Sequence, residues 1–398
     1  MNESRRKRLR WNEETVYALG LYKFIGRSLG IWPLRCNDIE SRIRLLVIAA
    51  LQIIMSYNLI QEIMSGCISI FDAVDFIGLL GTNTVCMLKI WVIRLNEKKM
   101  RRILESAVND WSMVRDESLD VMRKFAYRGK FVSIFQLSVA HLAAGFIIVG
   151  ALPTLGRTTE RATDVENFTV VEWRNLPMAT GCSVVNAPIF FYLGLYVLQF
   201  VQLLCVCACN FGTDSLFFGI AMHLCAQYEL LRNDIAELDR HDGEKKSKRR
   251  FVTLIQRHNH LVRLVNFVED VFHPIILGQL VASSLHITLL GMRRIPSAFK
   301  IFHFLWGKFI NDVLLCMYSF VGDCLSAQAK EMRNAAYNCS WYNFSPSFAK
   351  DVMFVIMRSN DSFHLTAGKV LRMNIEGFTR IVKTMASFFS VIKITIMG

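Results

Sequence analysis

The polar side chains best placed for chemistry lie in the last apolar stretch of the sequence, residues 376–398. Four charged residues interrupt this stretch and leave only nine consecutive uncharged positions: Glu376, Arg380, Lys383 and Lys393. Nine helical residues cover about 13 Å, less than half of a bilayer core of about 30 Å. Because a charge in mid-bilayer costs at least about 2.5 kcal/mol, this helix is expected to face protein or water.

Hydroxyl and aliphatic side chains share one face of the same helix. Helical spacing aligns Thr384, Ser387, Val391 and Thr395. A mixed stripe of this kind suits the lining of an ion conduit that an apolar constriction narrows. The alternative is that Arg380 and Lys383 lie at the lipid headgroups while Lys393 extends outward. These residues alone favour neither interpretation.

A second group of residues could bind a small organic molecule. Aromatic and small side chains gather near one end of several other apolar stretches. They are Phe71, Val74, Gly78, His141, Leu142, Gly145, Phe146, Tyr192, Tyr196, Phe302 and Trp306. Apolar cavities with a few polar groups bind such ligands, although ordinary core packing or an interfacial aromatic belt explains each residue taken singly.

The remaining polar residues of the apolar stretches indicate no catalysis. Lys308 and Asp312, four residues apart, pair with each other or face a wet crevice. His141 and His286 are more typical of hydrogen-bonded structural groups than of ligands. The sequence contains no Gly-rich phosphate loop, HExxH motif, CxxC pair or serine elbow. We therefore expect no enzyme activity, no cofactor and no metal site.

The 11 cysteines do not form a disulfide framework. Most lie in apolar stretches or in the basic segments described below, where Cys behaves as a small apolar side chain. Only Cys67 and Cys182 fall in segments assigned to the outer surface, and a bridge between them is a hypothesis.

The amino-acid composition predicts that these residues lie on membrane-spanning helices. Hydrophobic residues make up 53% of the 398 residues, only 20% are charged, and the mean hydropathy is +0.32. Seven stretches are long enough to cross a bilayer as helices: 45–65, 70–93, 131–152, 184–209, 272–292, 301–323 and 376–398. We therefore predict an all-α, polytopic membrane protein with seven transmembrane helices.

Basic residues predict the orientation of these helices, since Lys and Arg concentrate in cytoplasmic loops. Segments 1–44, 94–130, 210–271 and 324–375 hold 35 of the 46 Lys and Arg residues, and loops 66–69, 153–183 and 293–300 hold six. The N-terminus is therefore expected in the cytoplasm and the C-terminus outside. The net charge of +13 then signals orientation rather than nucleic-acid binding. Asn167, in an N-x-T pattern of the outer loop 153–183, is a predicted glycosylation site.

The inner segments are predicted to be mainly helical. Apolar residues at spacings of three and four predict that the fourth span continues past residue 209 and that a second helix leads into the fifth span. The predicted organisation is a cytoplasmic N-terminal segment (1–44), transmembrane helices 1–4 (45–209), a cytoplasmic helical hairpin (210–271), transmembrane helices 5 and 6 (272–323), a cytoplasmic helical anchor segment (324–375) and a seventh, pore-lining helix (376–398).

Short motifs in the second half of the chain resemble one family, the insect odorant receptors. The motifs are Tyr318 and Gly322, Ala336-Tyr337 with Trp341, Leu365-Thr366-Ala367-Gly368, Met373-Asn374-Ile375 to Phe378, Ile381-Val382-Lys383, Ser387-Phe388-Phe389, and Asp214-Ser215-Leu216 to Leu231. Seven spans, a length near 400 and an inner N-terminus agree with that family. The N-terminal half resembles it mainly in topology.

The resemblance implies a function. Such proteins are odorant-gated, non-selective cation channels in the plasma membrane of sensory neurons, and they form heterotetramers with the odorant receptor co-receptor. It implies that small apolar volatile ligands bind in the outer half, among the second to sixth spans. It places Tyr337, Trp341 and Phe378 at a subunit interface and the pore constriction at Val391 and Thr395.

Some features separate this chain from similar classes. Thr395 stands where the co-receptor has an aliphatic residue, and segment 210–271 lacks the co-receptor's long insertion, so the chain resembles a ligand-tuning subunit. Gustatory-type ligand-gated channels are the nearest alternative, but their Thr-Tyr and Gln-Phe signature is replaced by Ser387-Phe388-Phe389-Ser390. A G-protein-coupled chemoreceptor would have the opposite orientation, and a transporter would show repeat symmetry.

Overall fold

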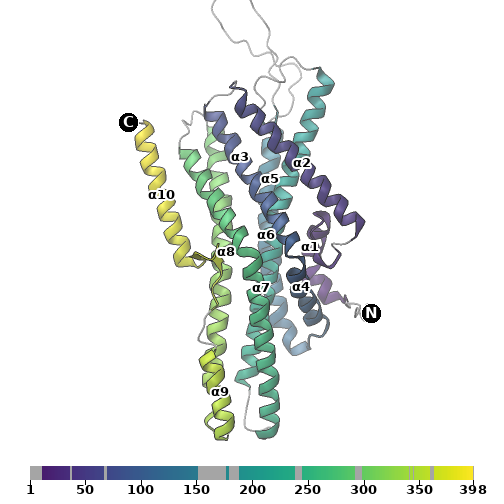
Figure 1. Cartoon of the computed structure of the whole chain (residues 1–398), viewed down its shortest axis with the longest axis vertical. Helices are drawn as coiled ribbons and strands as arrows, with labels where there is room; N and C mark the ends of the chain where they lie inside the picture. Colours follow the sequence, from purple (N-terminus) through teal and green to yellow (C-terminus); the bar gives the residue numbers. More distant parts are fainter. Residues whose placement is uncertain are drawn as a thin grey trace, which may run out of the picture.

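The computed structural model describes residues 11–35, 38–66, 70–150, 176–178, 188–237, 244–291, 298–339, 341–343, 345–358 and 363–397. The helices are α1 (Glu13–Ser28), α2 (Ile39–Met64), α3 (Ile70–Leu95), α4 (Glu97–Ser112), α5 (Asp116–Gly150), α6 (Ile189–Ala236), α7 (Glu244–Gly291), α8 (Ala298–Asn338), α9 (Pro346–Arg358) and α10 (Ile375–Met397). Two single-turn 3-10 helices, Pro33–Arg35 and Trp341–Asn343, and two strands, β1 (Thr366–Ala367) and β2 (Leu371–Arg372), complete these elements. They form an elongated bundle from which α10 diverges (Figure 1).

Each of the seven predicted spans coincides with a helix or with part of one, namely α2, α3, α5, α6, α7, α8 and α10. Among the described residues, α2, α3, α5, α6 and α7 are long and apolar enough to cross a membrane. The sixth and seventh spans, in α8 and α10, and the orientation of the chain stay predictions.

Helix α6 is the centre of the bundle. It continues without a break from Ile189 to Ala236, and every residue from Gly212 to Tyr228 is buried. A helix that is covered on all sides must be surrounded by other elements, and α1, α3, α5, α7 and α8 all contact it. The expected long helices on both sides of residues 237–243 are present, because α7 also spans 48 residues.

A short β-hairpin is the departure from an all-helical fold in the part of the chain that the structure describes. Strands β1 and β2 pair antiparallel within the segment 324–375 that we expected to be mainly helical. Gly368 and Lys369 both have positive φ, +63° and +62°, and Val370 N donates to Ala367 O at 3.2 Å. Two such residues form a tight turn that suits the twist of a hairpin, and glycine adopts this conformation without steric cost.

Three predicted features fall outside the described residues. Asn167, Cys67 and Cys182 belong to segments that the structure leaves undescribed. Glycosylation at Asn167 and the bridge between Cys67 and Cys182 therefore stay predictions.

Candidate functional site

One of the predicted ligand residues of α3, Gly78, lies at a close contact with α7. Val74 is buried. A Cβ atom added to Gly78 would lie 3.0 Å from Nδ1 of His286 on α7. Gly78 thus lets an imidazole lie directly against the α3 backbone, and His286 is a neighbour of the predicted site.

The predicted ligand residues of α6 form a second group. Tyr192 is only 1% exposed and packs with Leu176, Leu195 and Tyr196. The Tyr196 hydroxyl donates to the carbonyl of Ile148 on α5 at 3.0 Å. These two tyrosines therefore pack within the chain.

The predicted residues of α5 are less enclosed. Leu142 and Phe146 are exposed, and nothing lies within 4 Å of a Cβ atom added to Gly145. Nδ1 of His141 lies 2.7 Å from the carbonyl oxygen of Leu137 in its own helix. As ligand contacts, these four residues stay predictions.

Part of the predicted outer loop takes part in this region, which the sequence did not lead us to expect. Leu176 and Met178 are buried, and Met178 N donates to Oε1 of buried Gln199 on α6 at 3.0 Å. Met178 packs with Met55 of α2 and Phe76 of α3. The sequence carried no signal for this packing, because other residues of the same loop, such as Val170 and Trp173, are equally apolar.

Four predicted site residues have side chains outside the described part of the chain: Phe71, Phe302, Trp306 and Thr395. Their roles in ligand binding and in the pore stay predictions.

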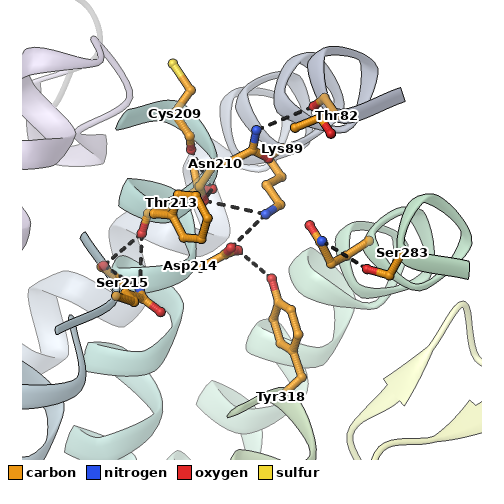
Figure 2. Close-up of polar contacts among 12 residues, drawn as sticks. Thr82, Lys89, Cys209, Asn210, Thr213, Asp214, Ser215, Ser283 and Tyr318 are labelled. Carbon is orange, nitrogen blue, oxygen red and sulfur yellow. Dashed lines mark hydrogen bonds and ion pairs between the residues drawn. The ribbon is translucent and has the colours of Figure 1, made fainter. Parts of the chain in front are cut away.

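A buried ionic network joins α3, α6 and α8 (Figure 2). Nζ of Lys89 on α3 lies 2.7 Å from Oδ2 of Asp214 on α6, and the hydroxyl of Tyr318 on α8 donates to Oδ1 of the same carboxylate at 2.5 Å. Lys89 and Tyr318 are at most 2% exposed and Asp214 is 3% exposed. A buried charge requires such partners, so the network ties together three helices that are distant in sequence.

Further polar contacts extend the network. Asn210 Nδ2 donates to the carbonyl of Thr82 on α3 at 3.4 Å, and Gln136 Nε2 of α5 donates to the Ser215 hydroxyl at 2.7 Å. Four helices therefore meet in one polar layer. The Asp214 and Tyr318 motifs were noticed in the sequence, whereas Lys89, the single basic residue of the second predicted span, was missed as their partner.

The network also fixes the relative depth of two helices. Asp214 lies five residues beyond the predicted end of the fourth span, whereas its partner Tyr318 lies five residues before the predicted end of the sixth. These two predicted ends are therefore about ten residues, or about 15 Å, apart along the bundle. The apolar stretch of α8 continues into the protein core, where hydropathy does not distinguish core from lipid.

The β-hairpin fastens the start of α10 to α7. The backbone NH of Thr366 donates to Oε2 of Glu269 on α7 at 3.0 Å, and its hydroxyl donates to the other carboxylate oxygen. Gly368 N donates to the carbonyl of His273, also on α7, at 2.9 Å. Both contacts use the family-like motif Leu365 to Gly368.

The other side of the hairpin contacts α8. Ile375 N donates to Oδ2 of Asp323 at 2.8 Å. A Cβ atom added to Gly322 would lie 1.9 Å from the carbonyl oxygen of Met373, so only glycine permits this approach. Residues 365–375, which we term the α10 clamp, therefore attach the start of α10 to both α7 and α8.

Most of the described side chains in the second half of α10, including those of three predicted pore residues, are exposed in the single chain. Thr384, Ser387 and Val391 are exposed, as are Ala386, Phe388 and Ser390 on other faces of the helix, whereas Met385 is buried in the main core. Beyond the α10 clamp the helix diverges from its neighbours (Figure 1). The single chain thus leaves a stripe of hydroxyl and aliphatic groups uncovered.

The predicted subunit-interface residues differ in exposure. Tyr337 is 64% exposed, and Nε1 of Trp341 donates to its carbonyl at 3.0 Å. Phe378 packs partly buried against the core of its own chain. An interface role for all three stays a prediction.

A cavity of about 410 Å³ opens among α4, α5, α6 and α7. Arg257 in its wall pairs with Asp234 at 3.1 Å and donates to Oε1 of Gln227 at 2.8 Å. None of the predicted ligand residues lines it. Among the described residues, no group of His, Cys, Asp and Glu is arranged to hold a metal ion.

Comparison with known proteins finds relatives among the insect odorant receptors. Odorant receptor 13a of Drosophila melanogaster is 23% identical over 321 residues, which cover 76% of this chain and 75% of that protein. Odorant receptor 82a of the same species is 21% identical over 185 residues, and the match spans about half of it, 48%. The odorant receptor coreceptor of Anopheles gambiae is 22% identical over 144 residues, 35% of this chain and 30% of its own length.

A solved structure shares the fold. The insect olfactory receptor OR5 from Machilis hrabei, in complex with eugenol, aligns with a TM-score of 0.73 at 14% identity, over 95% of this chain and 98% of that one. A family model described as 7tm Odorant receptor matches residues 69–386. Since this match covers most of the sequence, the chain belongs to the odorant receptor family.

Proposed function

We propose that this chain is the ligand-tuning subunit of an odorant-gated, non-selective cation channel. The observation that carries the proposal is the uncovered stripe of Thr384, Ser387 and Val391 on α10. The α10 clamp fixes the start of this helix, whereas the Thr384, Ser387 and Val391 side chains are exposed in the single chain. Equivalent helices of further subunits would enclose a water-filled path along that face.

The partner in this proposal is the odorant receptor co-receptor, with which the chain forms a heterotetramer. Sequence similarity to coreceptors of two insects supports a shared assembly surface. The match to the odorant receptor family model favours this function over a gustatory-type channel.

The proposed ligand is a small, mainly apolar volatile molecule that binds in the outer half. Apolar and aromatic side chains with few polar groups support this class, as around Tyr192 and Val74. The ligand would open the pore through a higher affinity for the open state. The proposed location is the plasma membrane of sensory neurons, with a cytoplasmic N-terminus.

Co-expression tests the proposal most directly. Cells that express this chain with a co-receptor should give cation currents in response to some members of a panel of volatiles, and the same panel should give none with this chain alone. The co-receptor alone is the control for currents that do not need this chain. Normal surface expression of both subunits without any current across the panel would contradict the channel function.

A single substitution tests the pore position. Val391→Asp should change the relative permeability of sodium and calcium ions, because a carboxylate in a narrow path attracts and retains divalent cations. Val16→Asp is the matched control, since Val16 is similarly exposed, at 54% against 58% for Val391, but lies on α1. Unchanged permeability in Val391→Asp channels would contradict a pore-lining position.

A further inference from the structure

The sulfur atoms of two cysteines from different helices are in contact. Sγ of Cys225 on α6 and Sγ of Cys324 on α8 are 2.8 Å apart, although the residues are 99 positions apart in sequence. Both are free thiols. A disulfide has a sulfur separation of about 2.05 Å, so a movement of less than about 1 Å would bring these atoms to bonding distance.

Contacts around the pair hold the two helices in register. Tyr318 of α8 donates a hydrogen bond to Asp214 of α6. The ring centroids of Phe218 on α6 and Phe320 on α8 lie 6.4 Å apart. Residues of α6 and α8 within about three helical turns before the thiols therefore meet across the same interface. The packing of α6 against α8 thus holds Cys225 and Cys324 close together.

The two thiols have different environments. Cys225 is fully buried, whereas Cys324 is half-buried. The hydrogen bond with Cys225 and the nearby guanidinium of Arg128 lower the pKa of Cys324, against the effect of its partial burial. Burial raises the pKa of Cys225. Because the thiolate is the reactive form, Cys324 is the attacking group and Cys225 the second partner.

The geometry points to a redox-sensitive dithiol at Cys225 and Cys324 that a peroxide converts into a disulfide between α6 and α8. In the first step the Cys324 thiolate attacks hydrogen peroxide, the O–O bond breaks, and Cys324 becomes a sulfenic acid as hydroxide leaves. In the second step Cys225 attacks that sulfur and water leaves. The protein loses two electrons and two protons, and the peroxide is reduced to water.

Such a bond would restrict movement of α6 against α8. It lies in segments that we assign to the reducing cytoplasm, where disulfides are usually transient and redox-sensing. Peroxide would close it, and cytosolic thiols would reopen it by thiol–disulfide exchange. This inference does not depend on channel activity.

Peptide mapping of the full-length chain tests the bond itself. Membranes are treated with hydrogen peroxide, free thiols are blocked with iodoacetamide, and the protein is digested with chymotrypsin without reduction. Cleavage after aromatic residues and leucine separates peptides 225–228 and 321–325 from every other cysteine. We expect these two peptides to be joined, with a mass two hydrogens below their sum, and to separate on reduction.

Oxidation of exposed Met357 (72% exposed) reports that the peroxide dose was effective. Recovery of both peptides as alkylated thiols at a dose that converts Met357 to its sulfoxide would overturn the proposal.

Two variants test the order of the steps. Cys225→Ser should stop the reaction at the sulfenic acid, so that dimedone labels peptide 321–325 of a chain that still elutes as folded protein in size-exclusion chromatography. Cys316→Ser is the matched control, because Cys316 lies on the same helix, and it should leave the cross-link unchanged. Absence of a dimedone adduct on folded Cys225→Ser protein would overturn Cys324 as the attacking group.

Discussion

At the scale of single residues, the Lys89–Asp214–Tyr318 network contains the most deeply buried ion pair of the described residues. Its charges are nearly inaccessible to water, so their desolvation is offset only by their mutual contacts. The network orders the bundle by fixing which turns of α3, α6 and α8 meet. Removing one partner is therefore expected to cost more than removing the whole pair.

Substitution of Lys89 tests this expectation. Lys89→Met leaves the Asp214 carboxylate buried without its cation and should destabilise the chain by about 3–5 kcal/mol. The midpoint of thermal unfolding in detergent measures the loss. Adding Asp214→Leu to Lys89→Met should recover part of this stability, and a double variant that is less stable than Lys89→Met would contradict the argument.

The close approach at Gly322 gives a second prediction at this scale. Gly322→Ala places a methyl group where the Met373 carbonyl lies, so the α10 clamp must shift and the thermal midpoint should fall. Gly194→Ala is the control, because nothing lies within 4 Å of that position. Alanine favours helix by about 0.5–1 kcal/mol over glycine, so the control should be neutral or stabilising. Equal midpoints for the two variants would contradict the close packing.

At the scale of elements, the α10 clamp joins the predicted pore helix to the rest of the chain. Its contacts reach Glu269 on α7 and Asp323 on α8, so residues 365–375 connect the start of α10 to both helices. The first half of α10 therefore has a fixed position, whereas the exposed half depends on neighbouring subunits in the proposed assembly.

Substitution of Glu269 tests whether the α10 clamp couples α7 to the predicted pore helix. Glu269→Gln replaces one acceptor of Thr366 by an NH₂ group, so we expect weaker coupling and a higher ligand concentration for half-maximal current. Glu237→Gln is the matched control, because the Glu237 side chain is 72% exposed and pairs with Arg250 outside the α10 clamp, and exposed pairs contribute only about 0–1 kcal/mol. Equal dose–response curves for wild type and Glu269→Gln would contradict the coupling.

The contact of α1 with α5 should depend on pH. A hydrogen bond from Arg123 lowers the pKa of Glu14 below its ordinary value of 4.5. A carboxylate whose pKa is lower in the folded state stabilises that state above the unfolded pKa, and this contribution is lost as pH falls through the lower folded value. The difference in thermal midpoint between wild type and Glu14→Gln should thus be constant above pH 4.5 and shrink below it. A difference that grows on acidification would contradict this assignment.

At the scale of the whole molecule, the distribution of charge and of apolar helices indicates a membrane-spanning protein. The basic excess of +13 is concentrated in alternate segments, and five described helices are apolar enough to cross a membrane. The bundle is longer than these spans because α6 and α7 continue well beyond their apolar parts.

Orientation is the prediction that belongs to this scale. An epitope at the N-terminus should bind antibody only after cells are permeabilised, whereas one after residue 398 should bind on intact cells. Each tagged chain serves as the control for the other. Labelling of the N-terminal epitope on intact cells would contradict the proposed orientation and favour the G-protein-coupled arrangement.

The sequence by itself determined the helical class, the approximate spans and the family resemblance, because these depend on local hydropathy, helical periodicity and short motifs. Only the tertiary structure decided which residues meet. The Lys89–Asp214, Cys225–Cys324 and Glu269–Thr366 contacts join positions 97 to 125 residues apart. Such contacts depend on the register between long helices, and a shift of one helical turn would separate every pair while leaving the hydropathy pattern of each helix unchanged.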